Sequence, residues 1–209
     1  MNKTNKKRFK IAVAMSGGLD SSVAAAILKK QGYDVIGIFM RLSPQKSFYE
    51  SEARARKVAE ILNIPFYVFD FEKEFKKRII KSFLKEYKMG ITPNPCVLCN
   101  KEMKFGLLLE KILSLNIDFI ATGHYARLRR EIVNSKSEIK KYKYQLLKAK
   151  DKYKDQSYFL WRLSQKQLKR ILFPIGNYTR REVENLAKKF KFDFLLKIKK
   201  STEICFVLA

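Results

Sequence analysis

The stretch Ser16-Gly17-Gly18-Leu19-Asp20-Ser21-Ser22 decides the fold of this chain. It follows an apolar run, Ile11 to Met15, and precedes a helix-like run, Val23 to Leu28, so the order is strand, tight turn and helix. Glycines let the backbone approach a ligand closely, and the free N–H groups at a helix start attract phosphate. The aspartate and the serine hydroxyls are suited to holding magnesium or binding phosphate oxygens. The stretch therefore predicts a phosphate-binding turn. The alternative is an ordinary turn in which Asp20 or Ser21 caps the helix. The stretch is not a Walker motif, because no Gly-Lys-Ser/Thr follows the glycines.

Strands and helices continue to alternate after this turn. The apolar run Val35–Arg41 is typical of a parallel strand covered on both faces. Ile64–Phe69 and Asp118–Ala121 are predicted as the third and fourth strands. Apolar residues at helical spacing predict helices over residues 52–62, 72–88 and 101–115. We therefore predict an α/β fold with an open, mostly parallel sheet and helices on both faces. Ligands of such sheets bind beyond the carboxyl ends of the strands, so residues 122–127 should face the phosphate-binding turn.

The remaining segments are less regular. Two prolines indicate that residues 89–100 form a shaped loop, which carries two thiols. The charged residues 129–143 predict a surface excursion or a hairpin, and residues 154–161 predict a short helix that carries aromatic side chains. Two capping boxes mark two further helices, and an apolar, strand-like tail closes the chain at residues 204–209. The boxes are Ser164 with Gln167 and Thr179 with Glu182.

The composition points to a polyanionic partner. The chain has 209 residues, with 45 Lys and Arg against 20 Asp and Glu, which gives a formal charge of +25 and a pI near 10.0. Nucleic acid is the leading candidate, although the composition bias of an AT-rich genome would also enrich lysine. Three cysteines are too few for a secreted disulfide scaffold and indicate a reducing, cytoplasmic compartment. The basic N-terminus and five apolar residues fit neither a signal peptide nor a membrane span, so we expect no membrane partner.

Six separated strings resemble one family, the tRNA-specific 2-thiouridylases (the MnmA family) of the PP-loop ATP pyrophosphatases. In chain order they are AMSGGLDSS, TPNPCVLCNKEMKFG, ATGHYAR, LLKAKDKYKDQSYFLW, FPIG and STEICF. The resemblance implies an adenine nucleotide alpha hydrolase-like fold and the ATP-dependent replacement of the 2-oxygen of the wobble uridine by sulfur. It implies ATP and Mg²⁺ as cofactors, and tRNA and a persulfide-carrying sulfur-donor protein as partners.

The resemblance also assigns roles to residues. It implies that Cys99 is the catalytic nucleophile and that Cys205 carries the persulfide sulfur, with a disulfide between them after transfer. The implied ATP-contacting positions are Ala14, Met15, Ser16, Gly17, Gly18, Leu19, Asp20, Ser21, Met40 and Gly123. The implied tRNA-contacting positions are Asn94, Pro95, Cys96, His124, Lys154, Asp155 and Gln156.

The family pattern further divides the chain into two parts. Residues 1–150 correspond to the ATP-binding and catalytic domain, and residues 151–209 to a helical, tRNA-contacting segment that ends in the strand of the second cysteine. Family members continue into a small central domain and a C-terminal barrel, which we expect this chain to lack, either as a fragment or as a shortened protein. Two other functions stay open: another PP-loop adenylating enzyme that needs no cysteine pair, and a catalytically silent tRNA-binding remnant.

The cysteines allow more than one chemistry. The thiolate is the nucleophilic form of sulfur, and Cys99 stands near a predicted helix start, where the helix dipole favours the thiolate. Together with His124, the cysteines could instead hold zinc or an iron–sulfur cluster. Many family members have Asp where this chain has Cys96, which puts an acid–base role at that position in question and adds a third thiol.

Overall fold

A five-stranded sheet forms the centre of the computed structural model, which describes residues 9–133, 141–198 and 204–206. The strand order is β3-β2-β1-β4-β7, and every neighbouring pair is parallel. The strands are β1 (Lys10–Ala14), β2 (Asp34–Arg41), β3 (Phe66–Asp70), β4 (Phe119–Thr122) and β7 (Ile171–Leu172). In the central strand, Ala12 lies opposite Ile36 of β2 and Ile120 of β4. The strand order reverses between β1 and β4, which makes their carboxyl ends the expected ligand-binding edge.

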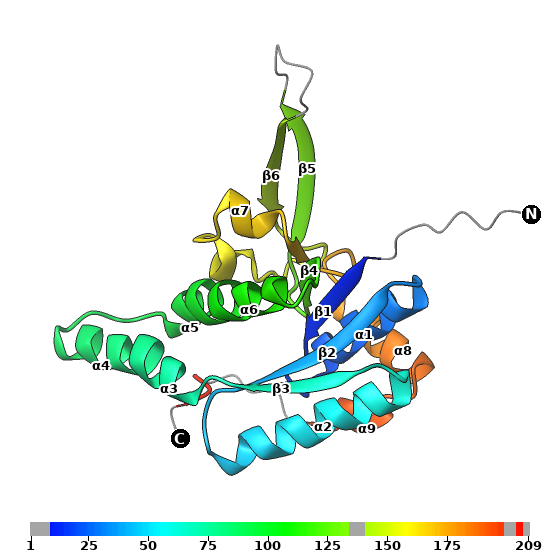
Figure 1. Cartoon of the computed structure of the whole chain (residues 1–209), viewed down its shortest axis with the longest axis horizontal. Helices are drawn as coiled ribbons and strands as arrows, with labels where there is room; N and C mark the ends of the chain where they lie inside the picture. Colours follow the sequence, from blue (N-terminus) through cyan, green and yellow to red (C-terminus); the bar gives the residue numbers. More distant parts are fainter. Residues whose placement is uncertain (1–8, 134–140, 199–203, 207–209) are drawn as a thin grey trace, which may run out of the picture.

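Helices cover both faces of this sheet (Figure 1). One face carries α1 (Leu19–Lys30), α2 (Lys46–Leu62), α8 (Arg180–Lys189) and α9 (Asp193–Leu196), which share one apolar core. The other face carries a continuous helix made of α5 (Pro95–Cys99), η2 (Asn100–Leu108) and α6 (Leu109–Ser114). Alternate residues of β1 enter the two cores, because successive strand side chains point to opposite faces. The predicted α/β architecture is confirmed.

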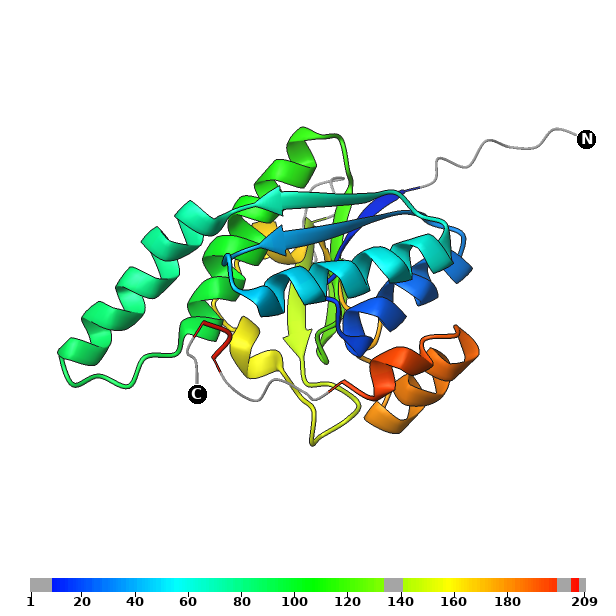
Figure 2. The ribbon, with the colours of Figure 1, turned by 90° about the horizontal axis from the view of Figure 1, so that it is seen from below.

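A second long helix leans away from the sheet after β3 (Figure 2). It consists of α3 (Glu72–Phe75), η1 (Lys76–Ile80) and α4 (Lys81–Lys88). Phe75 and Ile79 pack against Met103 of η2 in a third apolar cluster. Both long helices contain a π-helical segment, a wider turn that often occurs at functional sites.

A two-stranded antiparallel hairpin projects from the body (Figure 1). Its strands are β5 (Arg127–Val133) and β6 (Lys141–Leu147). The 3₁₀ helix η3 (Ser157–Leu160) and the short helix α7 (Gln165–Leu168) contact β6 at the base of the hairpin. Of the two structures predicted for the charged segment, the hairpin is the one observed.

Both predicted capping boxes are confirmed. The hydroxyl of Ser164 accepts a hydrogen bond from the backbone N–H of Gln167 at the start of α7, and Thr179 accepts one from Glu182 at the start of α8. These bonds depend on residues three positions apart, so the sequence alone specifies them.

The loop predicted over residues 89–100 is too long. Pro95 is the first residue of α5, and the Oδ1 of Asn94 accepts a hydrogen bond from the backbone N–H of Val97 at 3.2 Å. Proline suits the first turn of a helix because the N–H that it lacks would have no helical partner there. Cys96 and Cys99 therefore lie on a helix.

Other predicted boundaries also change. The helix predicted from residue 52 begins at Lys46, the short helix predicted over 154–161 is η3 alone, and β7 was not predicted. The N-cap of α1 is Gly18, not Asp20 or Ser21. The strand-like tail is wrong where it is described, because Cys205 and Phe206 form a turn, and residues 207–209 lie outside the described part.

Within the described residues, no helix combines the length and apolar character needed to cross a membrane.

Candidate active site

The turn between β1 and α1 is held by its own serines. The Oγ of Ser21 accepts a hydrogen bond from the backbone N–H of Ser16 at 3.1 Å and lies 3.2 Å from the Oγ of Ser16. The hydroxyls of Ser21 and Ser22 both donate to the carbonyl of Gly18, at 3.2 and 2.8 Å. The turn is therefore fixed, while the first N–H groups of α1 have no helical partner and are suited to an anion.

Two glycines make this arrangement sterically possible. Gly17 has a φ of +73°, and a Cβ added there would lie 2.1 Å from the backbone oxygen of Ser51 in α2. A Cβ on Gly123, just after β4, would lie 2.4 Å from the backbone nitrogen of Ser21. Real Cβ atoms do not approach so closely, so only glycine lets α2 and the end of β4 pack directly against the phosphate-binding turn.

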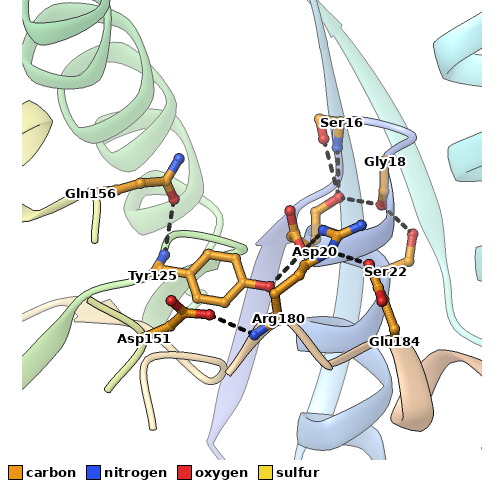
Figure 3. A network of polar contacts seen from close by, with 10 residues as sticks. Ser16, Gly18, Asp20, Ser22, Tyr125, Asp151, Gln156, Arg180 and Glu184 are labelled. Carbon is orange, nitrogen blue, oxygen red and sulfur yellow. Dashed lines mark hydrogen bonds and ion pairs between the residues drawn. The ribbon is translucent and has the colours of Figure 1, made fainter. Parts of the chain in front are cut away.

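Asp20 is the centre of a polar network (Figure 3). Its Oδ1 accepts hydrogen bonds from the hydroxyl of Tyr125 at 2.9 Å and from a guanidinium nitrogen of Arg180 at 2.8 Å. Arg180 also donates to Glu184 at 2.6 Å, and its backbone N–H donates to Asp151. The network joins the phosphate-binding turn to the start of α8.

The sequence did not single out Tyr125 or Arg180. Tyr125 belongs to the ATGHYAR string, but nothing in that string indicates a partner for its hydroxyl. Arg180 is 160 positions from Asp20, and Thr179 before it drew attention only as a helix cap. Burial first, and then the negative charge of Asp20, raise the pKa of Tyr125, so this phenol stays protonated and donates. A third side chain, Arg54, donates to the carbonyl of Gly17 at 3.2 Å.

Two residues of the predicted tRNA-contacting stretch belong to the same framework. The side-chain oxygen of Gln156 accepts a hydrogen bond from the backbone N–H of Tyr125 at 2.9 Å. The carboxylate of Asp155 accepts from the backbone N–H of Ala149 and from the hydroxyl of Ser157. The side chains of Gln156 and Asp155 thus bind the protein's own backbone and hydroxyl groups, and Lys154 is the basic residue of the three. They also connect the stretch, through Tyr125, to Asp20.

His124 is an uncharged, packed side chain. Its ring centroid lies 6.1 Å from those of Phe105 and Phe173, and its Nδ1 lies 2.8 Å from the Oγ1 of Thr122. Burial, followed by the positive charge of Lys104, lowers its pKa well below the ordinary value. His124 is therefore a neutral hydrogen-bonding group near neutral pH.

The three cysteines lie near one another, although Cys205 is far away in the sequence. The ring of Phe206 is in edge-to-face contact with Phe75 and Phe83, at centroid distances of 5.6 and 5.3 Å. Phe206 and Cys99 pack against the same apolar cluster. The backbone segment that carries Cys205 thus runs beside α5, as Figure 2 also shows.

All three cysteines are free thiols in this structure. Burial raises the pKa of Cys99 to about 11 and also raises the pKa values of Cys96 and Cys205. The ammonium group of Lys104 lowers the pKa of each, and the sequence did not identify this lysine. The expected thiolate at Cys99 is therefore wrong for this state. In the continuous helix that begins at Pro95, Cys96 lies in the first turn and Cys99 in the second, so Cys96 is nearer the positive end of the helix.

The other predicted ATP-contacting residues lie at the carboxyl ends of strands. Ala14 ends β1, Met40 is the next-to-last residue of β2, and Met15 directly follows β1. Leu19 begins α1, and the side chains of Met15 and Leu19 are buried. Among the described residues, no group of three His, Cys, Asp or Glu side chains is placed to hold a metal ion.

Comparisons with known proteins agree with these features. A family model described as the tRNA methyl transferase HUP domain matches residues 9–209. A protein of Geotalea uraniireducens (strain Rf4), tRNA-specific 2-thiouridylase MnmA, is 46% identical over 216 aligned residues, which cover 97% of this chain and 55% of that protein. In Thermoanaerobacter sp. (strain X514), tRNA-specific 2-thiouridylase MnmA 2 is 48% identical, with 95% and 55% covered. The chain spans about half the length of the curated relatives it matches.

Solved structures share the fold at low identity. The U34-tRNA thiolase NcsA of Methanococcus maripaludis, described with its 4Fe–4S cluster, aligns with a TM-score of 0.58 at 18% identity, covering 100% of this chain and 63% of that chain. An NMN synthetase of Francisella tularensis aligns with a TM-score of 0.52 at 16% identity, covering 93% and 66%. At such identities the likeness establishes the α/β fold alone.

Proposed function

Because the chain belongs to the tRNA methyl transferase HUP domain family, we propose that it catalyses ATP-dependent 2-thiolation of the wobble uridine of tRNA. One observation carries the proposal. The turn after β1 lies at the carboxyl edge of the parallel sheet, and near that edge the segment that carries Cys205 runs beside α5, which carries Cys96 and Cys99. Figure 2 shows the backbone of these segments. The first feature suits activation of an oxygen by ATP, and the second suits its replacement by sulfur.

Activation makes the oxygen a better leaving group. The 2-oxygen of the uracil attacks the α-phosphorus of ATP, a bond to AMP forms and pyrophosphate leaves. The backbone N–H groups at the start of α1 would hold the phosphates. Arg180 and Tyr125 position Asp20 through Oδ1, and Oδ2 remains to contact Mg²⁺ together with the phosphates of ATP. Bound Mg²⁺ would neutralise charge on the departing pyrophosphate.

Sulfur transfer requires two thiols. A persulfide on Cys205 attacks C2 of the adenylated base through its terminal sulfur, and AMP leaves with the oxygen. The thiolate of Cys99 then attacks the Sγ of Cys205, and the bond between this Sγ and the sulfur now attached to C2 breaks. The thiolated tRNA is released, and a Cys99–Cys205 disulfide is left behind. An external thiol reductant supplies the two electrons that restore both thiols. Asn94, Pro95 and Cys96 would contact the target base.

The proposal includes the wider setting of the reaction. A sulfur-donor protein supplies the persulfide, and the reaction takes place in the cytoplasm. Residues 1–150 form the ATP-binding and catalytic domain, and residues 151–209 form a tRNA-contacting segment that supplies the second catalytic cysteine, Cys205. The surface that meets tRNA includes Lys154, Asp155, Gln156 and His124. The framework contacts of Gln156 with Tyr125 support a role for this stretch in linking tRNA binding to the ATP site.

The test is a reaction with tRNA, ATP, Mg²⁺, a persulfide-carrying sulfur-donor protein and a thiol reductant. We expect tRNA-stimulated ATP–pyrophosphate exchange and 2-thiouridine in the recovered tRNA by mass spectrometry. Exchange without any need for tRNA would indicate another adenylating enzyme, and tRNA binding without exchange would indicate a silent remnant. Iron in anaerobically purified protein, with equal loss of activity on changing each cysteine, would replace the persulfide relay with a cluster.

A further inference from the structure

We propose that an exposed aromatic and basic surface beside the active site binds the substrate tRNA outside the loop that carries the target uridine. The inference rests on the proposed function and adds a contact surface to it. We call this surface the arm platform. It consists of Arg130, Ile132, Tyr142, Tyr158, Trp161 and Arg162.

One face of the hairpin supplies the upper half of the platform. Residues directly opposite each other in an antiparallel pair share a face, and Leu128 lies opposite Leu146. Both leucines pack against the apolar core between the five-stranded sheet and the helix η2–α6. Four positions further along the same face, Ile132 lies opposite Tyr142, and these side chains are 58% and 42% exposed. The apolar face therefore continues beyond the point where the core ends.

The 3₁₀ helix η3 supplies the lower half. It contacts β6, and its Leu160 is buried in the same core as Leu128. Gln165 braces the hairpin here, since its side chain bonds both the N–H and the carbonyl of Tyr144, each at 2.8 Å. Tyr158 and Trp161 point away from that core and are each 65% exposed. Figure 1 shows α7 and the neighbouring turn beside the base of β6.

The chemistry of the platform suits RNA. The guanidinium carbon of Arg130 lies 4.6 Å from the ring centroid of Tyr142, and that of Arg162 lies 5.8 Å from the ring of Trp161. Planar arginine and aromatic groups stack on unpaired bases, and the cations neutralise phosphates. The six residues of the platform include two arginines and no acidic residue, and the chain carries a formal charge of +25. An RNA with exposed, unpaired bases is therefore the partner that fits this surface.

The opposite face of the same hairpin differs and provides a control. Arg129 lies 3.6 Å from Glu131, whose carboxylate also accepts a hydrogen bond from Gln145 at 2.7 Å. Arg129 thus has a carboxylate partner. Its removal takes away one positive charge, as removal of Arg130 does, but it disturbs no aromatic stack.

Trp161 makes the proposal directly measurable, because it is the only tryptophan in the chain. Titration of the 209-residue chain with tRNA should quench its fluorescence in a saturable way. The double variant Arg130→Ser with Tyr142→Ala should weaken tRNA binding by about tenfold or more, the effect expected for loss of one base stack. The matched variant Arg129→Ser with Gln145→Ala should change affinity by less than about threefold at equal salt. Circular dichroism checks that both variants are folded.

The outcomes separate this inference from the proposed function. Unchanged fluorescence at saturating tRNA, or equal losses in the two double variants, would overturn the platform even where tRNA-stimulated ATP–pyrophosphate exchange is normal. Absence of that exchange, with quenching and the variant difference intact, would overturn the thiolation proposal and leave an RNA-binding surface. Failure of tRNA to bind in filter-retention assays would overturn both.

Discussion

The two ends of the candidate active site are held together by different forces. At the phosphate-binding turn, a carboxylate, a guanidinium and a phenol are joined by hydrogen bonds of 2.8 and 2.9 Å. At the cysteine end, aromatic and aliphatic contacts bring Cys205 to Cys99. Polar contacts have directions and fix the positions of groups, whereas apolar contacts bring segments together with little directional control. The ATP end is therefore built before substrate arrives.

The cysteine end also differs in its charge state. Burial raises the pKa of Cys99 to about 11, so its thiol is protonated near neutral pH. Thiolate is the form that attacks, hence this end needs a change in its surroundings before it reacts. We infer that a bound tRNA or a nearby cation supplies that change, and four predictions test the contrast between the two ends.

The largest effect is expected for the cysteines. Cys99→Ser and Cys205→Ser should each reduce thiolation at least about a thousandfold, because each removes a sulfur that forms a bond in the reaction. ATP–pyrophosphate exchange should stay near the parent value in both. The control Cys96→Ser should be milder. Normal thiolation by either serine variant, measured as 2-thiouridine by mass spectrometry, would refute the relay.

At the other end, Asp20→Ala should reduce ATP–pyrophosphate exchange roughly 10- to 100-fold, since it removes two hydrogen bonds to the network, one of them from a charged group. Glu184→Gln is the matched change, because Glu184 bonds Arg180 but does not contact Asp20. We expect it to cost less than Asp20→Ala. Equal losses would show that the network as a whole, and not the carboxylate in the turn, carries the activation step.

Phe206→Ala tests whether apolar packing places Cys205. The change removes two edge-to-face ring contacts, each worth about 1 kcal/mol, so thiolation should fall by about tenfold or more. Exchange should be unaffected, and the melting temperature should change little because the segment lies at the edge of the fold. Loss of exchange together with thiolation would mean that the two ends are not independent.

The smallest effect concerns pH and Lys104. A thiol with a raised pKa becomes thiolate as the pH increases, so the logarithm of the single-turnover thiolation rate should rise with pH between 7 and about 9 while exchange stays nearly flat. The ammonium of Lys104 lowers the thiol pKa values, hence Lys104→Met should raise them and slow thiolation about fivefold at pH 8. A pH-independent rate in both proteins would contradict protonated resting thiols.

The sequence specified features that depend on neighbouring residues. The strand–turn–helix order around Gly17 and Gly18, the strands β1 to β4 and the two capping boxes all follow from local periodicity and from hydrogen bonds that span three or four positions. Where two local rules competed, the sequence interpretation was wrong. Pro95 suggested a loop, yet proline also suits the first helical position, and Asn94 provides the cap that decides for a helix.

Only the tertiary structure decided how distant groups meet. The pairing of Asp20 with Arg180 joins residues 160 positions apart, and no local pattern specifies a partner at that separation. The raised pKa of Cys99 arises from burial, and Cys99 packs against an apolar cluster that includes Phe75 and Ile79 of another helix. The sequence by itself determined the phosphate-binding turn and the candidate residues. Packing between distant elements determined their charge states and partners, because desolvation and hydrogen bonding depend on which groups surround a side chain in space.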